Sequence, residues 1–404
     1  MAYEVKEAKE LVIKAGLELM EKGLIARTWG NVSARISDTQ FVITPSGIPY
    51  EDLTPEKIVV VNIADCEYEG DVKPSSEKGV HADAYRLRPD VNFVIHTHQT
   101  AASVASIRAN NISNLPEDCS VVIGPMIPIA EYGISSTKTL RENVAKVVAS
   151  YTACKAVLMK HHGAVCLGKD YDEAFAVADA LEKACQADIA KAVQAKGGAD
   201  KGYADLADVF TETVVPEVDR SIALQDLGSS KRTAYGFVLT MKDGSTYDCT
   251  PYGNAKAGIA PRCAAVHAEI YRNTDVKFIS QYTAPEAIAV SKEGVDEPLY
   301  FDDFVQIAGF SVKNCGWDKS SYRKQAIAIG KAARGTNAVF VKGQGALCTA
   351  NNEYDAKAVE LVLEKECRAH LLAGLVDDAD TIAKVGGILE RVVYVAKYSK
   401  QADK

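Results

Sequence analysis

Two histidines stand one residue apart in the apolar stretch VIHTHQT. Alternate residues of a β-strand point to the same face, so His96 and His98 share one face of the expected strand. A third histidine, His162, ends another apolar run and is followed by Gly163, which lets the backbone turn tightly. Three imidazoles with a carboxylate at an exchangeable position, here Glu77, suit a catalytic zinc site.

The chain contains an internal repeat that bears on this interpretation. AVLMKHHGAVCLG (156–168) resembles AVFVKGQGALCTA (338–350), and the match continues into the next helix. Upstream, VHADAYRLRPDVNFVIHTHQTAASVAS matches VHAEIYRNTDVKFISQYTAPEAIAVS with one short deletion. A repeat of this length and order indicates a duplicated domain.

All four candidate positions change together in the second copy, while neighbouring packing residues are retained. His96 becomes Gln281, His98 becomes Thr283, His162 becomes Gln344 and Glu77 becomes Cys263. If these residues served only the fold, the second copy would need them too. Their joint loss indicates a shared task that the second half has given up.

Two other histidines favour a structural interpretation. His81 recurs as His267, so we expect it to serve the fold. His161 lies beside His162 and points to the opposite face of the strand, so we expect it to be packed or to support the site indirectly.

Three short stretches together predict an anion site. TWGNVS offers Gly30 and Asn31, TPSGIPY offers Ser46 and Gly47, and PSSE offers Ser75 and Ser76. We expect Ser75 or Ser76 to cap a helix, where free N–H groups and the helix dipole favour phosphate. The second half has TPYG and APRC in place of TPSG and PSSE, so the anion site is lost with the metal site.

Each half is expected to be an α/β domain, with a central sheet flanked by helices. In the first half the helices are expected at 7–23, 75–88, 138–151 and 170–194, and the strands near 41–47, 57–63, 92–98 and 156–162. A Gly- and Asp-rich stretch follows, so we place the catalytic domain at 1–211 and a degenerate domain, which lacks a counterpart of 52–73, at 212–404.

Composition excludes several classes of function. The 404 residues are 47% apolar and 25% charged, as in an ordinary globular protein, and the net charge of −8 argues against a nucleic-acid partner. No apolar run approaches the ~18 residues of a membrane span. Ten cysteines without CxxC spacing and without an export signal indicate reduced thiols, so we expect a cytoplasmic protein with no membrane partner.

These residues resemble the class II aldolase/adducin family, most closely its L-fuculose-1-phosphate aldolase branch. The matching run includes TWGNVSARI, FVITPSGIPYEDLT, KPSSEKGVHADAYRLRPDVNFVIHTHQTAASVASI and LMKHHG, and covers nearly all of the first half. The resemblance implies one Zn²⁺ per chain, held by His96, His98 and His162, with Glu77 as the acid/base. It implies a phosphate site at Gly30, Asn31, Ser46, Gly47, Ser75 and Ser76.

The implied reaction is cleavage of a ketose 1-phosphate to dihydroxyacetone phosphate and an aldehyde. Two alternatives stay open. The same enediolate chemistry would serve a phosphosugar 4-epimerase, decarboxylase or dehydratase, and adducin-like members are interaction proteins without catalysis. The related 4-epimerases carry aspartate where this chain has Glu77, which favours the aldolase branch.

One family residue is missing from the first half. The aldolases use a tyrosine of a neighbouring subunit as a second acid, and the matching position here is Glu117. Aligning Asp303 with Asp118 puts Tyr300 of the second half close to that position. The family forms cyclic tetramers, so we expect a homodimer with pseudo-fourfold symmetry and two zinc ions, in which Tyr300 completes the site.

Overall fold

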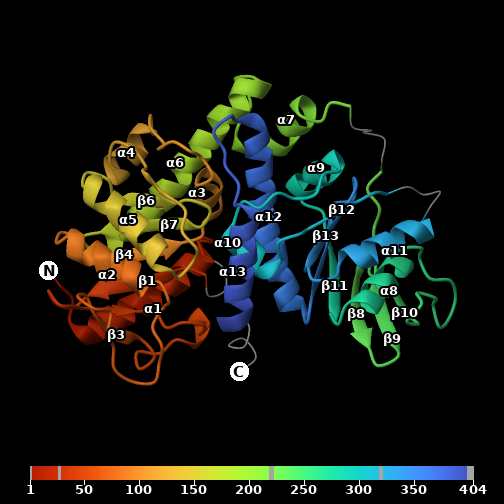
Figure 1. Ribbon diagram of the computed structural model, residues 1–404, viewed down its shortest axis with the longest axis horizontal. Coiled ribbons are helices and arrows are strands. Elements are labelled where there is room, and N and C mark those ends of the chain that lie inside the picture. The colour runs from red at the N-terminus through yellow and green to blue at the C-terminus, as the bar shows by residue number, and fades with distance from the viewer. Residues whose placement is uncertain (1, 26–28, 218–222, 318–321, 398–404) are drawn as a thin grey trace. The chain divides into compact units, whose positions relative to one another are not determined.

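A computed structural model describes residues 2–25, 29–217, 223–317 and 322–397 of the chain. The chain divides into two compact units (Figure 1). The first unit consists of Met1–Ala192 with Asp378–Thr381 and Val392–Lys404, and the second of Val193–Asp377 with Ile382–Arg391. A boundary at residue 211 between duplicated domains stays a prediction.

The first half of the chain alternates strands and helices around one sheet. Its elements are α1 (Val5–Glu21), β1 (Asn31–Arg35), β2 (Gln40–Ile43), η1 (Tyr50–Asp52), β3 (Val59–Asn62), α2 (Lys78–Leu87), β4 (Phe93–Thr97), α3 (Thr100–Ala105), α4 (Glu117–Ile123), β5 (Ile129–Ala130), α5 (Lys138–Ser150), β6 (Ala156–Met159), β7 (Gly163–Gly168) and α6 (Tyr171–Gly197).

The second half follows the same plan. Its elements are η2 (Tyr203–Asp205), α7 (Leu206–Thr213), β8 (Ser229–Thr233), β9 (Gly236–Thr240), β10 (Thr246–Cys249), α8 (Ala264–Asn273), β11 (Phe278–Tyr282), α9 (Pro285–Glu293), α10 (Asp302–Ile307), β12 (Asn314–Cys315), α11 (Tyr322–Ala332), β13 (Ala338–Val341), β14 (Ala346–Ala350), α12 (Glu353–Leu375) and α13 (Lys384–Lys397). None of the helices among the described residues is long and apolar enough to cross a membrane.

The two sheets have the same strand order. The first runs β3-β2-β1-β4-β7-β6-β5 and the second β10-β9-β8-β11-β14-β13-β12. Because β10 takes the place of β3, the expectation that the second half lacks a counterpart of all of 52–73 is wrong. The register equates FVIT of β2 with FVLT of β9, so the counterpart of TPSG is TMKD (240–243) and not TPYG. In both sheets the neighbouring strands are antiparallel, except for the parallel pairs β5–β6 and β12–β13. The predicted fold of two α/β domains, each with a sheet flanked by helices, is confirmed.

In the first unit, α2 and α5 cover one face of the sheet. Val80 of α2 and Leu140 of α5 belong to the same buried cluster as Val94 of β4. Side chains alternate along a strand, so His96 lies on the same face as Val94, where that core ends. Phe93 points the other way and contacts Tyr171 of α6, at a ring distance of 5.5 Å.

In the second unit, α8 and α11 take the corresponding place. Val266 of α8 and Ile329 of α11 share a buried cluster with Ile279 of β11. In the first unit the end of β4 lies beside Glu77, the residue that precedes α2. In the first unit that place holds the candidate active site.

Candidate active site

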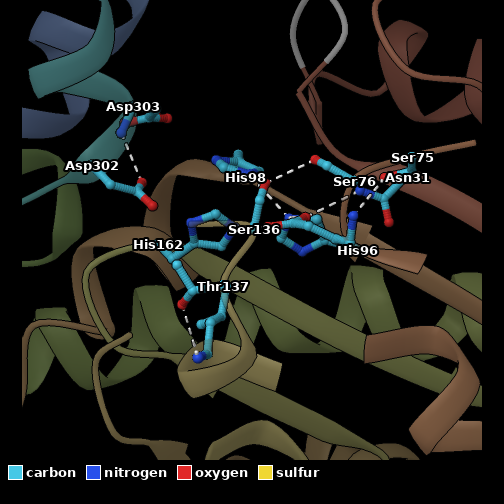
Figure 2. A network of polar contacts seen from close by, with 12 residues as sticks. Asn31, Ser75, Ser76, His96, His98, Ser136, Thr137, His162, Asp302 and Asp303 are labelled. Atoms are coloured by element: carbon cyan, nitrogen blue, oxygen red, sulfur yellow. Dashed lines mark hydrogen bonds and ion pairs between the residues drawn. The ribbon is translucent and has the colours of Figure 1, made fainter. Parts of the chain in front are cut away.

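The three predicted ligand histidines meet at the end of β4 (Figure 2). His96 and His98 come from β4 and the residue after it, and His162 comes from the turn between β6 and β7. Because β4 pairs with β7, with His96 opposite Val165, that turn lies beside the end of β4. One ligand nitrogen from each histidine lies within 4.8 Å of the other two.

The hydrogen bonds of His96 prepare its Nε2 atom for a metal. Its Nδ1 lies 2.8 Å from the carbonyl oxygen of Ala164, which can only accept, so Nδ1 carries a proton and Nε2 is the ring atom that faces the other two histidines. That Nε2 lies 3.0 Å from Nε2 of His98. Three converging imidazoles form a donor set that fits Zn²⁺. Within the described ranges, no second group of three or more His, Cys, Asp or Glu side chains has this geometry.

Gly163 makes the approach of His162 to β4 sterically feasible. A Cβ atom at this position would lie 2.3 Å from the carbonyl oxygen of Thr97 and 3.3 Å from the ring of His96. Any other residue would therefore push the β6–β7 turn away from β4 and separate His162 from the other two histidines.

Glu77 lies directly beside the three imidazoles. Its Oε1 is 3.0 Å from Nε2 of His162 and its Oε2 is 3.1 Å from Nε2 of His96. Burial opposes ionisation of this carboxyl, but His96 and His162 outweigh it and lower the pKa of Glu77 well below its usual range. The side chain is therefore a carboxylate, held where it can receive a proton from a group bound at the three histidines.

The helix after the PSSE stretch begins later than the sequence suggested. Its N-cap residue is Glu77, not Ser75 or Ser76, and α2 starts at Lys78. The hydroxyl of Ser75 still accepts a hydrogen bond from the amide of Glu77, at 3.2 Å. The two serines are thus part of the turn that leads into α2, because Ser75 is held by the preceding loop.

The predicted anion-binding stretches are brought together around that turn. Pro45 and Pro74 form an antiparallel bridge, and the amide of Ser46 donates to the carbonyl of Lys73 at 2.9 Å. The amide of Ser75 donates to the carbonyl of Thr44 at 3.0 Å. The TPSG and PSSE stretches therefore lie side by side next to Glu77.

Two further features complete this side of the site. The hydroxyl of Ser136 donates to that of Ser76 at 2.8 Å, and a cavity of about 230 Å³ beside them is also lined by Thr137 and Arg141. Gly30 has φ 96°, and a Cβ there would lie 2.7 Å from the carbonyl oxygen of His96. This glycine permits close approach of Gly30 and Asn31 to β4.

Asn31 has a contact that the sequence did not predict. Its side-chain amide bridges Glu77 and His81, at 3.2 Å from Glu77 Oε2 and 2.5 Å from His81 Nε2. A signal for this contact was present in the repeat. The strand pairing β8–β11 places Gly228 where β1 has Asn31, so Asn31 is lost in the same copy that lost Glu77.

Two other residues discussed above, His161 and Tyr300, are not members of the triad. His161 is buried and its ring contacts that of Tyr132 at 5.5 Å, but it lies in the β6–β7 turn with φ 62°, so its expected place on the opposite face of a strand is wrong. Tyr300 lies in the second unit, just before α10. Its side chain is 5% exposed, and its ring is 6.2 Å from that of His370.

Comparisons with known proteins agree with this geometry. Residues 10–189 match the family model described as "Class II Aldolase and Adducin N-terminal domain". L-fuculose phosphate aldolase of Escherichia coli (strain K12) is 36% identical over 175 residues, which are 43% of this chain and 79% of the relative.

Two further matches cover a similar share of the chain. The 5-deoxy-D-ribulose 1-phosphate aldolase of Bacillus thuringiensis is 31% identical over 186 residues, 45% of this chain and 84% of the relative. A solved structure titled L-fuculose 1-phosphate aldolase is 31% identical, covers 44% of this chain and 83% of its own, and has a TM-score of 0.41. With the three histidines and Glu77 assembled at one point, the chain belongs to the class II aldolase and adducin family.

Proposed function

We propose that the protein is a zinc-dependent aldolase, which cleaves a ketose 1-phosphate to dihydroxyacetone phosphate and an aldehyde. The convergence of His96, His98 and His162 beside the buried carboxylate of Glu77 carries this proposal. Sugar-phosphate aldolases among the relatives support it. The ten cysteines are all free thiols, which supports a reducing, cytoplasmic setting.

Zinc at the three histidines would supply a Lewis acid that polarises the substrate's carbonyl group. The residues of the chain do the rest. Glu77 removes or returns the proton at the carbon next to the carbonyl, since its carboxylate borders the position where that group binds. Its burial, at 9% exposure, keeps bulk water away from the carbanion-like fragment.

The phosphate of the substrate is proposed to bind to Gly30, Asn31, Ser46, Gly47, Ser75 and Ser76. The side-by-side placement of the TPSG and PSSE stretches supports this assignment, since their hydroxyls and amides are suitable donors to a phosphate. Asn31 stays in the proposed set although its side-chain amide also contacts Glu77 and His81.

The second acid is proposed to be Tyr300 of a neighbouring chain in a homodimer with pseudo-fourfold symmetry and two zinc ions. Equivalent ion pairs support the underlying alignment: Lys183 contacts Asp118, and Lys365 contacts Asp303. Burial raises the pKa of Tyr300, so its hydroxyl holds its proton at neutral pH, as an acid must.

A screen of ketose 1-phosphates tests the proposal. The purified protein is expected to contain one zinc per chain and to release dihydroxyacetone phosphate from at least one of these substrates. A chelator should stop the release, and added zinc should restore it. Mass spectrometry of the products distinguishes the alternatives, because only aldol cleavage yields two carbonyl fragments. A protein without a bound divalent ion, or with full activity in chelator, would overturn the proposal.

A further inference from the structure

Glu77 is connected to the interior of the first unit by a continuous chain of hydrogen bonds. The hydroxyl of Tyr85 lies 2.7 Å from that of Ser33, and Ser33 Oγ lies 2.6 Å from His81 Nδ1. His81 Nε2 lies 2.5 Å from Asn31 Oδ1, and Asn31 Nδ2 donates to Glu77 Oε2 at 3.2 Å. All five side chains are buried, at 9% exposure or less.

The chemistry of the end groups fixes the direction of every bond in this chain. The carboxylate of Glu77 only accepts, so Asn31 must turn its NH₂ group toward it and its oxygen toward His81. His81 must then carry its proton on Nε2, and its Nδ1 accepts from Ser33. Burial, and next the nearby His96, lower the pKa of His81 to about 3, so the ring stays neutral and keeps this single tautomer.

The other tautomer of His81 would disturb Glu77. With the proton on Nδ1, Nε2 and the oxygen of Asn31 would be two acceptors facing each other, and the amide would have to rotate. Its oxygen would then face the carboxylate of Glu77, which is unfavourable in a buried site. The orientation of Glu77 therefore depends on a ring that does not touch it.

The second unit contains the same inner part of this chain. Ser230 Oγ lies 2.6 Å from His267 Nδ1 and 2.8 Å from the hydroxyl of Tyr271. His267 Nε2 instead donates to the carbonyl of Leu227, at 2.7 Å. The Ser–His–Tyr cluster therefore serves the fold in both units, as the sequence suggested for His81.

The outer part of this hydrogen-bond chain, Asn31 and Glu77, is present only in the first unit. The second unit has Gly228 in place of Asn31 and Cys263 in place of Glu77. Since a main-chain carbonyl satisfies His267, the fold does not require the asparagine. Asn31 is therefore present only in the unit that has Glu77, and packing does not account for it.

We propose that His81 is a positioning residue, which orients Glu77 for proton transfer through the side-chain amide of Asn31. This inference rests on the proposed role of Glu77 as the acid/base. It adds a task to His81 beyond the structural one that it shares with His267.

The state of the His81 ring can be measured without any substrate. ¹⁵N NMR of the whole protein with labelled histidine is expected to show His81 and His267 as neutral rings protonated on Nε2 between pH 5 and 8. A proton on Nδ1 of His81, or titration of the ring in this range, would overturn the proposal even if the protein is an active aldolase.

Three variants test the effect on Glu77. Glutamine can place an N–H where His81 has Nε2, whereas asparagine can only reach the place of Nδ1. The readout is exchange of a C–H proton of dihydroxyacetone phosphate with D₂O, which needs Glu77 but no second acid. His81→Asn is expected to slow the exchange by about tenfold with less than a twofold change in KM. His81→Gln should restore most of the rate, and the matched control His267→Asn should leave it unchanged.

Each outcome decides something. Equal exchange rates in the wild type, His81→Asn and His81→Gln would overturn the positioning role, while no exchange in the wild type would count against the proposed function instead. If His81→Asn does not fold, Asn31→Asp replaces it, because this isosteric change removes the N–H donor to Glu77. It should slow exchange at least as much, and a normal rate in this variant would overturn the proposal.

Discussion

The two units differ at the end of one strand, although their sheets have the same strand order. In the first unit, His96 and His162 lie beside a carboxylate and offer nitrogen lone pairs to a cation. In the second unit, Gln281 and Gln344 stand at these positions. An amide is a poor zinc ligand but a good partner for a main chain, since it both donates and accepts.

The two glutamines form hydrogen bonds of both kinds with the main chain of residues 223–227, which precede β8. Gln344 Oε1 accepts from the amide of Gln225 at 2.6 Å, and Gln281 Oε1 accepts from that of Leu227 at 2.8 Å. Their NH₂ groups donate to the carbonyls of Ala223 and Gln225, at 3.3 and 3.0 Å. The positions that form the candidate metal site in one unit thus hold a segment of the main chain in the other.

A second pair of positions shows a different kind of change. Arg108 and Asp188 form an ion pair at 2.9 Å in the first unit. At the equivalent positions the second unit has Glu293 and His370, 2.7 Å apart, so the charges are exchanged and the contact is kept. This contact survives as an exchanged ion pair, whereas the candidate metal ligands are replaced by side chains that make different contacts. This difference separates residues for the fold from residues for the chemistry.

The largest effect is expected from His96→Ala. The variant should lose its zinc and all turnover, because the two remaining imidazoles bind the metal weakly. The matched variant Gln281→Ala should keep both. Metal content by mass spectrometry, beside activity, checks the pair. Retained zinc with a near-normal rate in His96→Ala would show that the ligand is misassigned.

Tyr300→Phe tests whether the second unit contributes to the reaction. Loss of a general acid should lower turnover by roughly a hundredfold or more, while zinc content stays unchanged. Sedimentation of the wild type should show a dimer. A normal turnover in the variant, or a monomer at working concentration, would contradict a contribution from a neighbouring chain.

Ser76→Ala is expected to act mainly on binding. Loss of one phosphate contact should raise KM for a phosphorylated substrate by about tenfold, with a smaller change in kcat. The equivalent residue of the second half is Arg262, so Arg262→Ala is the matched control and should leave KM unchanged. An unchanged KM in Ser76→Ala would remove this residue from the phosphate site.

The sequence predicted the parts of this site that depend on local periodicity. His96 and His98 share a face because a strand repeats every two residues, and the repeat itself indicated the equivalent sheets. The contact of Asn31 with Glu77 was beyond such reasoning. It joins residues 46 positions apart and arises from the register of β1 on β4, in which Asn31 stands opposite His96.

The helix start was mispredicted for a related reason. Serine is a common N-cap, but Ser75 is held by its main chain to Thr44, so the helix begins only after Glu77. The glutamine contacts in the second unit could not be predicted either. The sequence shows that the candidate ligands are replaced, but not which contacts the new side chains make.

The glutamine contacts predict a local loss of stability. Gln344 is fully buried, so Gln344→Leu should leave the amide of Gln225 without a partner and cost about 1–3 kcal/mol in the second unit. Hydrogen exchange should show loss of protection at Gln225, and at Leu227 in Gln281→Leu. Thr283→Ala, at the third former ligand position, is the control. Unchanged protection in both glutamine variants would mean that other contacts hold this segment.

The smallest effect concerns pH, and it follows from the exchanged ion pair. Burial disfavours the charged form of His370, but Glu297 and Glu293 outweigh it and raise the pKa of His370 to about 10. A histidine whose pKa is higher in the folded state stabilises fully below its unfolded value of about 6.5, and this contribution is lost as the pH rises toward 10. In the first unit the cation of the equivalent ion pair is Arg108 in place of a histidine.

The two tryptophans allow this difference to be read separately, since Trp29 lies in the first unit and Trp317 in the second. The unfolding midpoint reported by Trp317 in a Trp29→Phe background should fall by a few degrees from pH 7 to pH 9. His370→Gln should lower the midpoint at pH 7 and remove most of this slope. In a Trp317→Phe background, the midpoint reported by Trp29 should change with pH by the same amount whether or not His370→Gln is present. A slope that persists in His370→Gln would assign the pH dependence to another group and leave the exchanged pair without an energetic consequence.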